Sequence, residues 1–427
     1  MLLLILSLLR FWLLLLLVLT SLGPSPSMAY YPNLMDNDAD QLLSLFRHYN
    51  NTRPVLRARA KAWFGVEDAL FFAETSYWWG SYAPSDYGCG RVKQKDVINP
   101  FMWHHIEGGI ELAQFHVRHW HMTRDEQVLK DFTLPWADEL LDWYDKHYPK
   151  TANGTIVMLN AKSCETYNHC TNPAPQVAGL QMVVAGLLTV PVSLLTPKRQ
   201  AFLKRLQKAI PRVPQMVNKQ GKDQIAPCLL NVSSAAGAAH ATGGFPIKAH
   251  TVNHEAVETY PMWPYEMRDL YADGNSLGQN TQDRPGRYGG SNTAWDYNAG
   301  LVPAILGGQE NARQAYASVL QRVSKTFDGS QNPMYALAGC CADGAPQMEN
   351  TGIVRQTIQK MLMTFDNPGF GSKIYLMPAW PKGRDVSFSL AAPLRTTVAV
   401  EYVKGTIVGL VVTPASRKAD VVMPTFL

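Results

Sequence analysis

The pattern of apolar and polar positions predicts a mainly helical chain from Asp36 to Thr364. Apolar residues recur at helical spacing in this region, and polar or glycine-rich loops separate the periodic stretches. We expect helices over residues 101–121, 125–148, 176–188, 196–210, 266–271, 293–306, 311–327 and 352–364.

Local signals fix some of the helix ends. Thr196-Pro197 is typical of a helix start, because a capping hydroxyl precedes a proline in the first turn. Pro135 is expected to break the stretch 125–148, and Gly108-Gly109 is expected to be tolerated inside the first helix.

The C-terminal tail has a different pattern. Its apolar residues are β-branched and partly alternate with polar ones, which predicts strands over 373–377, 386–391, 396–403 and 406–413. Lys404-Gly405 is expected to form the hairpin turn between the last two strands. The fold class is therefore mainly α with a small C-terminal β-module. Helices joined by long loops favour an α/α toroid with its site in the loops at one end. A solenoid would need a sequence repeat, and we see none.

The N-terminal residues 1–29 resemble a targeting segment. The run from Met1 to Leu22 is almost wholly apolar with one charge, Arg10, and Ser27-Met28-Ala29 offers small residues for cleavage before Tyr30. The apolar run after Arg10 is short for a membrane span, so a cleaved signal peptide is the main interpretation and an uncleaved signal anchor the alternative. Both place the mature chain in a secreted or lumenal location, with a membrane contact only if the leader is an anchor.

Cysteines and glycosylation sequons agree with that location. The six cysteines are Cys89, Cys164, Cys170, Cys228, Cys340 and Cys341. An even number permits disulfides in an oxidising compartment, and Cys164 and Cys170 are expected to pair across a short loop. Acceptor triplets for N-glycans begin at Asn50, Asn153 and Asn231.

Composition narrows the classes of function. Charged residues make up 17% and the net charge is +5, without a Lys/Arg block, so no nucleic-acid partner is expected. The chain has 11 Trp and 18 Tyr, several of them beside carboxylates. Aromatic faces with polar neighbours suit sugar rings, although ordinary core packing explains most aromatic residues. No Gly-x-Ser-x-Gly elbow and no zinc-site spacing are present, so neither a serine hydrolase nor a cofactor is implied.

Four clusters at loops or loop edges carry candidate chemistry, over residues 71–80, 99–109, 163–168 and 347–352. Glycoside hydrolysis needs one acid for the leaving oxygen and one base or nucleophile on the opposite face of the sugar. Glu165 and Glu349 suit this pair, because each lies in a loop-type segment and they are far apart in sequence. Glu349 precedes an apolar helix, whose dipole favours the ionised form that a base requires, although a simple capping role would look the same.

Histidines form a second candidate group, with His104-His105 shortly before His116, His119 and His121. Spacing of three residues allows two imidazoles on one metal. No carboxylate occupies a matching position, so packed or surface histidines are the preferred interpretation.

Several motifs, taken in order, resemble family 95 of the glycoside hydrolases and its bacterial relatives. The closing segment 375–383, the tail through Glu401-Tyr402 and 411–414, and the central stretch 258–265 carry the resemblance. Segments 72–80 and 164–180 also match loops of that group, and the similarity runs from about Leu42 to the C-terminus.

The resemblance implies a six-hairpin (α/α) toroid, inverting hydrolysis, and activity on α-L-fucosides or α-L-galactosides. It places Glu165 in the loop of the general acid, and Glu349 where the family has an aspartate base. Asn99 is the counterpart of one of the paired asparagines that polarise the water. The parent family also carries a large N-terminal β-domain, where this chain has only the leader.

These arguments predict an inverting, exo-acting α-glycosidase of oligosaccharides or polysaccharides, with its two carboxyl groups about 6.5–9.5 Å apart. The expected division is a leader (1–29), a toroidal catalytic domain (30–370) and a β-sheet module (371–427). The expected sugar platforms and hydroxyl partners are Glu74, Trp78, Trp79, Trp103, His105, Glu107, Tyr260, Trp263, Trp295 and Asp296.

Two other classes of protein remain open. One is a non-catalytic glycan-binding protein on a decayed hydrolase scaffold. The other is a polysaccharide lyase or sugar epimerase on a similar toroid.

Overall fold

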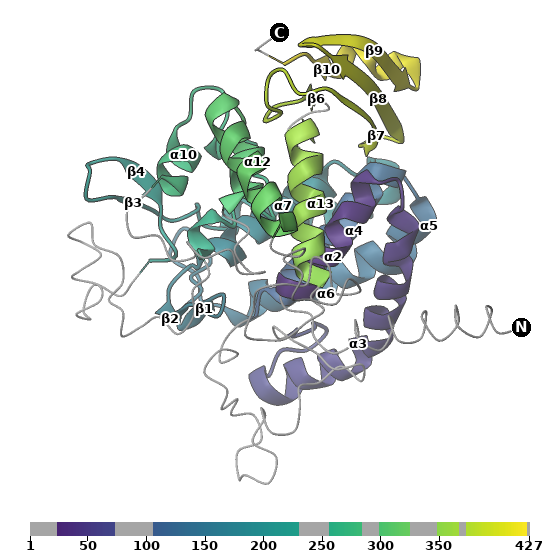
Figure 1. Cartoon of the computed structure of the whole chain (residues 1–427). Helices are drawn as coiled ribbons and strands as arrows, with labels where there is room; N and C mark the ends of the chain where they lie inside the picture. Colours follow the sequence, from purple (N-terminus) through teal and green to yellow (C-terminus); the bar gives the residue numbers. More distant parts are fainter. Residues whose placement is uncertain are drawn as a thin grey trace, which may run out of the picture.

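The computed structural model describes residues 24–72, 106–229, 256–283, 299–324, 348–366 and 373–424. These residues form a mainly helical body with short sheets, and the largest group of strands lies at one end of it (Figure 1). The mainly α fold with a C-terminal group of strands is therefore confirmed, while the closed six-hairpin toroid stays a prediction. The helices are α2 (Pro24–Met35), α3 (Leu42–Phe64), α4 (Gly108–Thr123), α5 (Glu126–Val128), α6 (Leu134–His147), α7 (Ala174–Leu188), α8 (Pro197–Ala209), α10 (Leu277–Gln282), α11 (Leu301–Leu306), α12 (Gln309–Ser324) and α13 (Met348–Leu362).

Helix ends follow the local chemistry of the sequence. The Thr196 hydroxyl accepts a hydrogen bond from the Arg199 amide at 3.2 Å, which caps α8 as the sequence predicts. The expected break at Pro135 is wrong, because the chain is helical without interruption from Glu126 to His147, and Pro135 follows a π turn within this run. Shorter helical turns complete the set: η1 (Ala39–Gln41), η2 (Leu129–Thr133, a π turn), η3 (Val192–Leu194), η5 (Val257–Thr259), η6 (Arg268–Leu270) and η10 (Ala415–Asp420).

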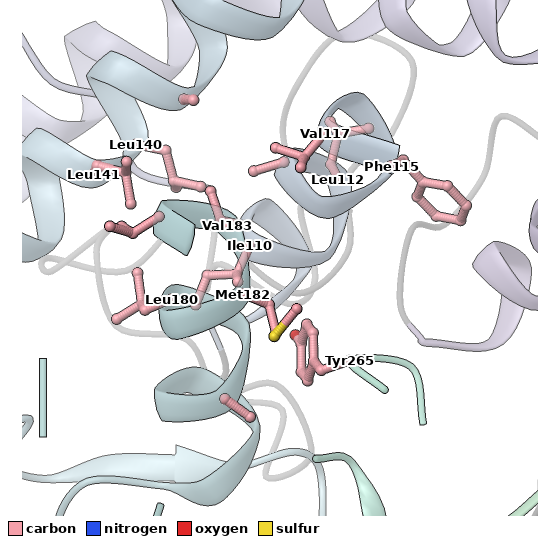
Figure 2. Packing of buried hydrophobic residues seen from close by; sticks show 14 of the residues in the cluster. Ile110, Leu112, Phe115, Val117, Leu140, Leu141, Leu180, Met182, Val183 and Tyr265 are labelled. Atoms are coloured by element: carbon pink, nitrogen blue, oxygen red, sulfur yellow. The ribbon is translucent and has the colours of Figure 1, made fainter. Parts of the chain in front are cut away.

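Helix α4 is the central element, since every side chain from Gly108 to Met122 is buried. It packs closely against α7 at Gly179, where an added Cβ would come within 2.4 Å of Ile110 Cγ2 and 2.7 Å of Tyr265 Cζ. Figure 2 shows Ile110, Leu180 and Val183 meeting in this packing, with Tyr265 beside them. Only glycine lets the two helices and the tyrosine approach this closely.

The strands form four small sheets. Strands β7 (Val386–Ala392), β8 (Thr396–Val403) and β9 (Thr406–Thr413) make an antiparallel sheet. The hairpin turn is at Lys404-Gly405, as predicted, and both residues have positive φ. Strand β6 (Ile374–Leu376) lies between β5 (Met363–Phe365) and β10 (Val421–Val422), and the two remaining pairs are β1 (Ala161–Ser163) with β2 (Tyr167–Cys170) and β3 (Gln215–Val217) with β4 (Asp223–Ile225).

We call the two sheets built from β5 to β10 the β-layer. Its core is shared with the helices, because Ala312 of α12 and Met361 of α13 pack in the same apolar cluster as Ile374 and Val398. Strand β5 lies before residue 371, so the β-layer takes one strand from before the predicted domain boundary.

The β-layer also binds the C-terminal end of α4. In the turn between β7 and β8, the amides of Leu394 and Arg395 donate to the carbonyls of His121 and Met122 at 2.8 and 2.9 Å. The Arg395 guanidinium donates to the carbonyls of Thr123 and Arg124 as well. These bonds satisfy carbonyls that the end of a helix leaves without partners.

Helix α2 packs against α13 at the start of the described chain. Met28 is buried, its carbonyl accepts from Gln356 Nε2 at 3.1 Å, and an added Cβ at Gly352 would come within 2.2 Å of that carbonyl oxygen. The predicted cleavage site before Tyr30 therefore lies inside α2. Within the ranges that the structure describes, no helix is both long and apolar enough to cross a membrane.

The predicted pairing of Cys164 with Cys170 is wrong. Cys170 forms a disulfide with Cys228, because the backbones of Thr171 and Leu229 exchange two hydrogen bonds of 2.8 Å and bring the cysteines side by side. Cys164 instead faces the helical interior as a buried thiol. Cys89, Cys340 and Cys341 lie outside the described residues.

Candidate functional site

The hairpin of β1 and β2 presents the predicted general acid. Glu165 lies in the tight turn between the strands and is half-buried, while both of its neighbours, Cys164 and Thr166, are fully buried. The Cys164 thiol donates to Glu107 Oε1 at 2.9 Å. Glu107 is buried and immediately precedes α4, so the hairpin turn is joined to the N-terminal end of the central helix.

Four backbone positions with positive φ lie in the same hairpin or within two residues of it. Asn160, Cys164, His169 and Asn172 all have positive φ, a conformation that residues other than glycine adopt at a cost. Strain of this kind persists only where the surroundings hold it, and it gathers at functional sites.

The surroundings do hold the hairpin on both strands. The Ser163 hydroxyl donates to the Pro227 carbonyl at 2.9 Å, and Gln176 Nε2 of α7 donates to the Lys162 carbonyl at 2.8 Å. The disulfide of Cys170 fixes the second strand. The hairpin that carries Glu165 is therefore held on both of its strands.

Glu349, the predicted base, lies in the first turn of α13, and its side chain is outside the described part of the structure. The position of Glu349 along the molecule can be derived from an ion cluster that includes Lys360, further along the same helix. Lys360 Nζ of α13 and Arg118 Nη1 of α4 bind the two oxygens of Glu266 at 2.9 and 2.8 Å. This contact places Arg118 and Lys360 at one level of the helical body.

Both helices run from that level toward the β-layer. The last carbonyls of α4 meet the turn between β7 and β8, and α13 continues directly into β5. Glu107 precedes Arg118 by eleven residues, and Glu349 precedes Lys360 by the same number. At 1.5 Å per residue each therefore lies about 16 Å from the ion cluster, on the side away from the β-layer.

Glu107, the hairpin turn with Glu165, and the start of α13 with Glu349 therefore share one end of the helical body. In Figure 1 the β1–β2 hairpin lies in the half of the molecule opposite the β-layer, consistent with this placement. We call this the acidic end, defined by Glu107, Glu165 and Glu349.

The ion cluster is buried, and its two cations determine the direction of the pKa shift of Glu266. Burial alone would raise the pKa of Glu266, but the adjacent Arg118 and Lys360 outweigh burial and hold the pKa below its usual value. The sequence gives no local sign of this cluster, because its three members come from distant segments.

A cavity of about 20 Å³ lies beside the ion cluster, lined by Tyr31, Arg118, His121, Glu266, Lys360 and Phe365 among others. This volume admits about one water molecule and not a sugar ring. The cavity beside the ion cluster therefore has no room for a sugar ring.

Between the ion cluster and the acidic end, α4 carries further buried polar groups. The Tyr31 hydroxyl lies 3.1 Å from Glu111 Oε1 and 3.2 Å from Gln114 Oε1, and Gln114 Nε2 donates to the Pro264 carbonyl at 2.7 Å. The pKa of Tyr265 is raised well above its usual value, first by burial and then by Glu107 and Glu111. Polar side chains thus line one face of α4 along most of its length.

Of the remaining predicted site residues, two are buried in the structure and the others lie outside the described residues. Tyr260 and Trp263 are buried, and Trp263 Nε1 donates to Gln356 Oε1 at 2.9 Å. Both rings pack against protein, and their role as sugar contacts stays a prediction. Eight predicted contacts lie outside the described residues: Glu74, Trp78, Trp79, Asn99, Trp103, His105, Trp295 and Asp296.

The histidines of α4 pack in the core. The His116 ring stacks on Phe46 with centroids 3.8 Å apart, and burial lowers its pKa well below the usual value. His121 Nε2 lies 2.9 Å from the Thr189 hydroxyl, and burial lowers the pKa of His121 to about 4. In the described ranges no group of histidine, cysteine and carboxylate side chains is arranged to hold a metal ion.

Comparisons with known proteins give structural matches only. No family model matches the sequence, and no curated protein matches it. A solved structure of a kojibiose phosphorylase from the human microbiome is similar with a TM-score of 0.54 at 8% identity, over 85% of this chain. The chain spans about half, 52%, of that protein. A structure of a glycosidase matches with a TM-score of 0.44 at 13% identity, over 78% of this chain and 86% of its own.

The first match shows a shared fold. At 8% identity it does not transfer an activity or a substrate, and the second match is too distant to add to it.

Proposed function

We propose that the chain is a glycoside-active enzyme that hydrolyses α-glycosides with inversion, using the carboxyl groups at the acidic end. The proposal is supported by the acidic end: Glu165 lies in the turn of the hairpin that contacts Glu107 before α4, and Glu349 lies in the first turn of α13. The fold similarity to a kojibiose phosphorylase supports a carbohydrate substrate.

In this scheme Glu165 is the general acid, and its proton goes to the glycosidic oxygen as the leaving group departs. Glu349 is the general base. It takes a proton from a water molecule, which attacks the anomeric carbon from the opposite face. The N-terminal end of α13 favours the ionised form of Glu349, which suits a base.

The proposed substrates are α-L-fucosides and α-L-galactosides in oligosaccharides or polysaccharides, on the resemblance to family 95. We propose Trp78, Trp79, Trp103 and Trp295 as sugar platforms, with Glu107 supporting the hairpin of the acid through Cys164. We also propose a secreted or lumenal location, supported by the Cys170–Cys228 disulfide, because such bonds persist in oxidising compartments.

Phosphorolysis is the second candidate, favoured by the fold match to a kojibiose phosphorylase. In that reaction inorganic phosphate replaces water as the nucleophile, and Glu165 keeps its role as acid. A base at Glu349 is then not needed, so the two candidates differ in the effect of removing that carboxylate.

The test measures turnover of aryl α-L-fucoside, aryl α-L-galactoside and kojibiose by the wild type and by Glu165→Gln and Glu349→Gln. Each substitution is expected to lower kcat by about 10²–10⁴-fold, because a positioned acid or base contributes that much. Glu310→Gln is the matched control, since that side chain is 82% exposed on α12.

Phosphate dependence separates the candidates. Activity without phosphate that needs both carboxylates supports hydrolysis. Activity that requires phosphate and survives Glu349→Gln supports phosphorolysis. Glycan binding that is unchanged by both substitutions, with no turnover, would contradict an enzymatic role.

A further inference from the structure

The two described sequons differ in where they lie in the fold. Asn153 is in an exposed turn between α6 and β1, whereas Asn50 is inside α3. An acceptor sequon is expected on a surface loop. The third sequon, at Asn231, lies outside the described residues.

The turn at Asn153 arranges its sequon side chains together. The Thr155 hydroxyl donates to Asn153 Oδ1 at 3.0 Å, the Thr155 amide lies 3.3 Å from the same oxygen, and the Thr151 hydroxyl also donates to it. All of these bonds use the amide oxygen. Glycosylation modifies the other atom of the amide, Nδ2, so the bonds can persist when a glycan is attached.

The turn is also closed by local contacts. The Thr151 amide donates to the Thr155 carbonyl at 2.8 Å, and the Gly154 amide donates to the Thr151 carbonyl at 2.9 Å. Gly154 has φ of +85°, which glycine adopts without strain. Because these bonds span only five residues, the turn can form before the rest of the chain folds and stay at the surface afterwards.

The sequon at Asn50 has the opposite geometry. Thr52 is buried, and its hydroxyl donates to the Tyr49 carbonyl at 2.8 Å. Residues two apart on a helix point in different directions, so this hydroxyl cannot lie against the Asn50 amide. Asn50 Oδ1 instead accepts from Arg53, whose guanidinium also binds Glu139 of α6.

A glycan on Asn50 would lie beside this contact between α3 and α6, whereas a glycan on Asn153 would project from an exposed turn. We propose that Asn153 carries an N-linked oligosaccharide in the mature protein and that Asn50 does not. In this modification Asn153 Nδ2 loses one proton and bonds to the anomeric carbon of the reducing-end sugar of a lipid-linked oligosaccharide, as the bond from that carbon to the lipid diphosphate breaks.

The experiment expresses the full chain with its own leader in a eukaryotic host and treats it with peptide N-glycosidase. Asn153→Gln and Thr155→Ala are each expected to reduce the change in gel mobility on deglycosylation by the amount due to one glycan. Thr155→Ser is expected to retain that change, because the hydroxyl remains. Asn50→Gln is the matched control and is expected to leave the shift unchanged. Mass spectrometry after enzymatic release in heavy-oxygen water should mark residue 153 as aspartate and leave residue 50 unmarked.

Three results would overturn the proposal. One is a marked residue 50, a second is an unchanged shift in Asn153→Gln, and a third is a chain recovered without any glycan on Asn153. Asn231→Gln is run beside them so that a glycan there is not counted for Asn153. The result does not depend on turnover, so it is independent of the proposed hydrolysis.

Discussion

At the residue scale, burial determines how much a charged side chain on the inner helices contributes to the free energy of unfolding. Glu266 is 3% exposed and lies between Arg118 and Lys360. Removing one member of such a group leaves buried charge without compensation, which is far more costly than losing a surface ion pair.

We therefore expect Glu266→Gln to lower the free energy of unfolding by about 3–5 kcal/mol. The matched control, Glu126→Gln, removes an exposed pair with Lys130 and is expected to change it by less than about 0.5 kcal/mol. Urea unfolding at neutral pH measures both. Equal, small effects would show that the ion cluster is not buried as described.

His121 gives a prediction about pH. Its pKa is lowered to about 4 in the folded chain, so between pH 6.5 and 4 the unfolded chain binds a proton that the folded chain does not. Stability due to this residue is therefore present above about pH 6.5 and is lost as the pH falls, by about 1.4 kcal/mol per pH unit in that window.

The measurement compares the wild type with His121→Gln, which cannot titrate. The difference in unfolding free energy between the two should shift in favour of the variant as the pH falls from 6.5 to 4. A difference that stays constant across this window would mean that His121 is exposed. Protonation of Glu266 at low pH destabilises both proteins alike, so its effect cancels in the comparison.

At the element scale, the sequence predicts helices well where local chemistry decides them. The cap at Thr196 and the turn at Lys404-Gly405 need only neighbouring residues, and both are confirmed, whereas the expected break at Pro135 is wrong because the chain stays helical through it. The segment 266–271, expected to be a helix, contains only the short turn η6, and Glu266 has a positive φ of 47°, outside the right-handed helical region.

Long-range contacts are where the sequence is least informative. Nothing near Cys170 indicates that the segment with Cys228 lies beside it, and nothing near Glu107 indicates the Cys164 thiol. The same holds for the site. The resemblance places Glu165 and Glu349 in separate segments, and only the directions of α4 and α13 place those segments at one end.

The contact between α2 and α13 gives a prediction at this scale. Gly352→Ala forces a methyl group against the Met28 carbonyl, and overpacking of this kind costs about 1–3 kcal/mol. We expect a fall of that size in a chain that retains Met28. In a chain beginning at Tyr30 the same substitution should cost much less, because Met28 is gone.

Thermal unfolding of both chain lengths, with and without the substitution, measures this. Gly405→Ala is a poor control because of its positive φ, whereas Ala317→Gly at an exposed position of α12 tests an ordinary helix change. An equal effect of Gly352→Ala in both chains would contradict the packing of α2 on α13.

At the scale of the whole molecule, α4 connects the β-layer with the acidic end. Its C-terminal end is held by the β-layer through Leu394 and Arg395, and its N-terminal end meets the hairpin of Glu165 through Glu107. The proposed chemistry lies at the acidic end, and the β-layer supports the other end of the same helix. We therefore propose a structural role for the β-layer and a catalytic role for the loops of the opposite end.

The most direct test of the central claim is the configuration of the first sugar released. Proton NMR would follow the wild type on an aryl α-L-fucoside or α-L-galactoside in phosphate-free buffer, before the product mutarotates. Inversion by these two carboxylates predicts that the β-anomer appears first, and that Glu165→Gln and Glu349→Gln each suppress its appearance. First release of the α-anomer, or turnover at the wild-type rate in either variant, would contradict inversion by these two carboxylates.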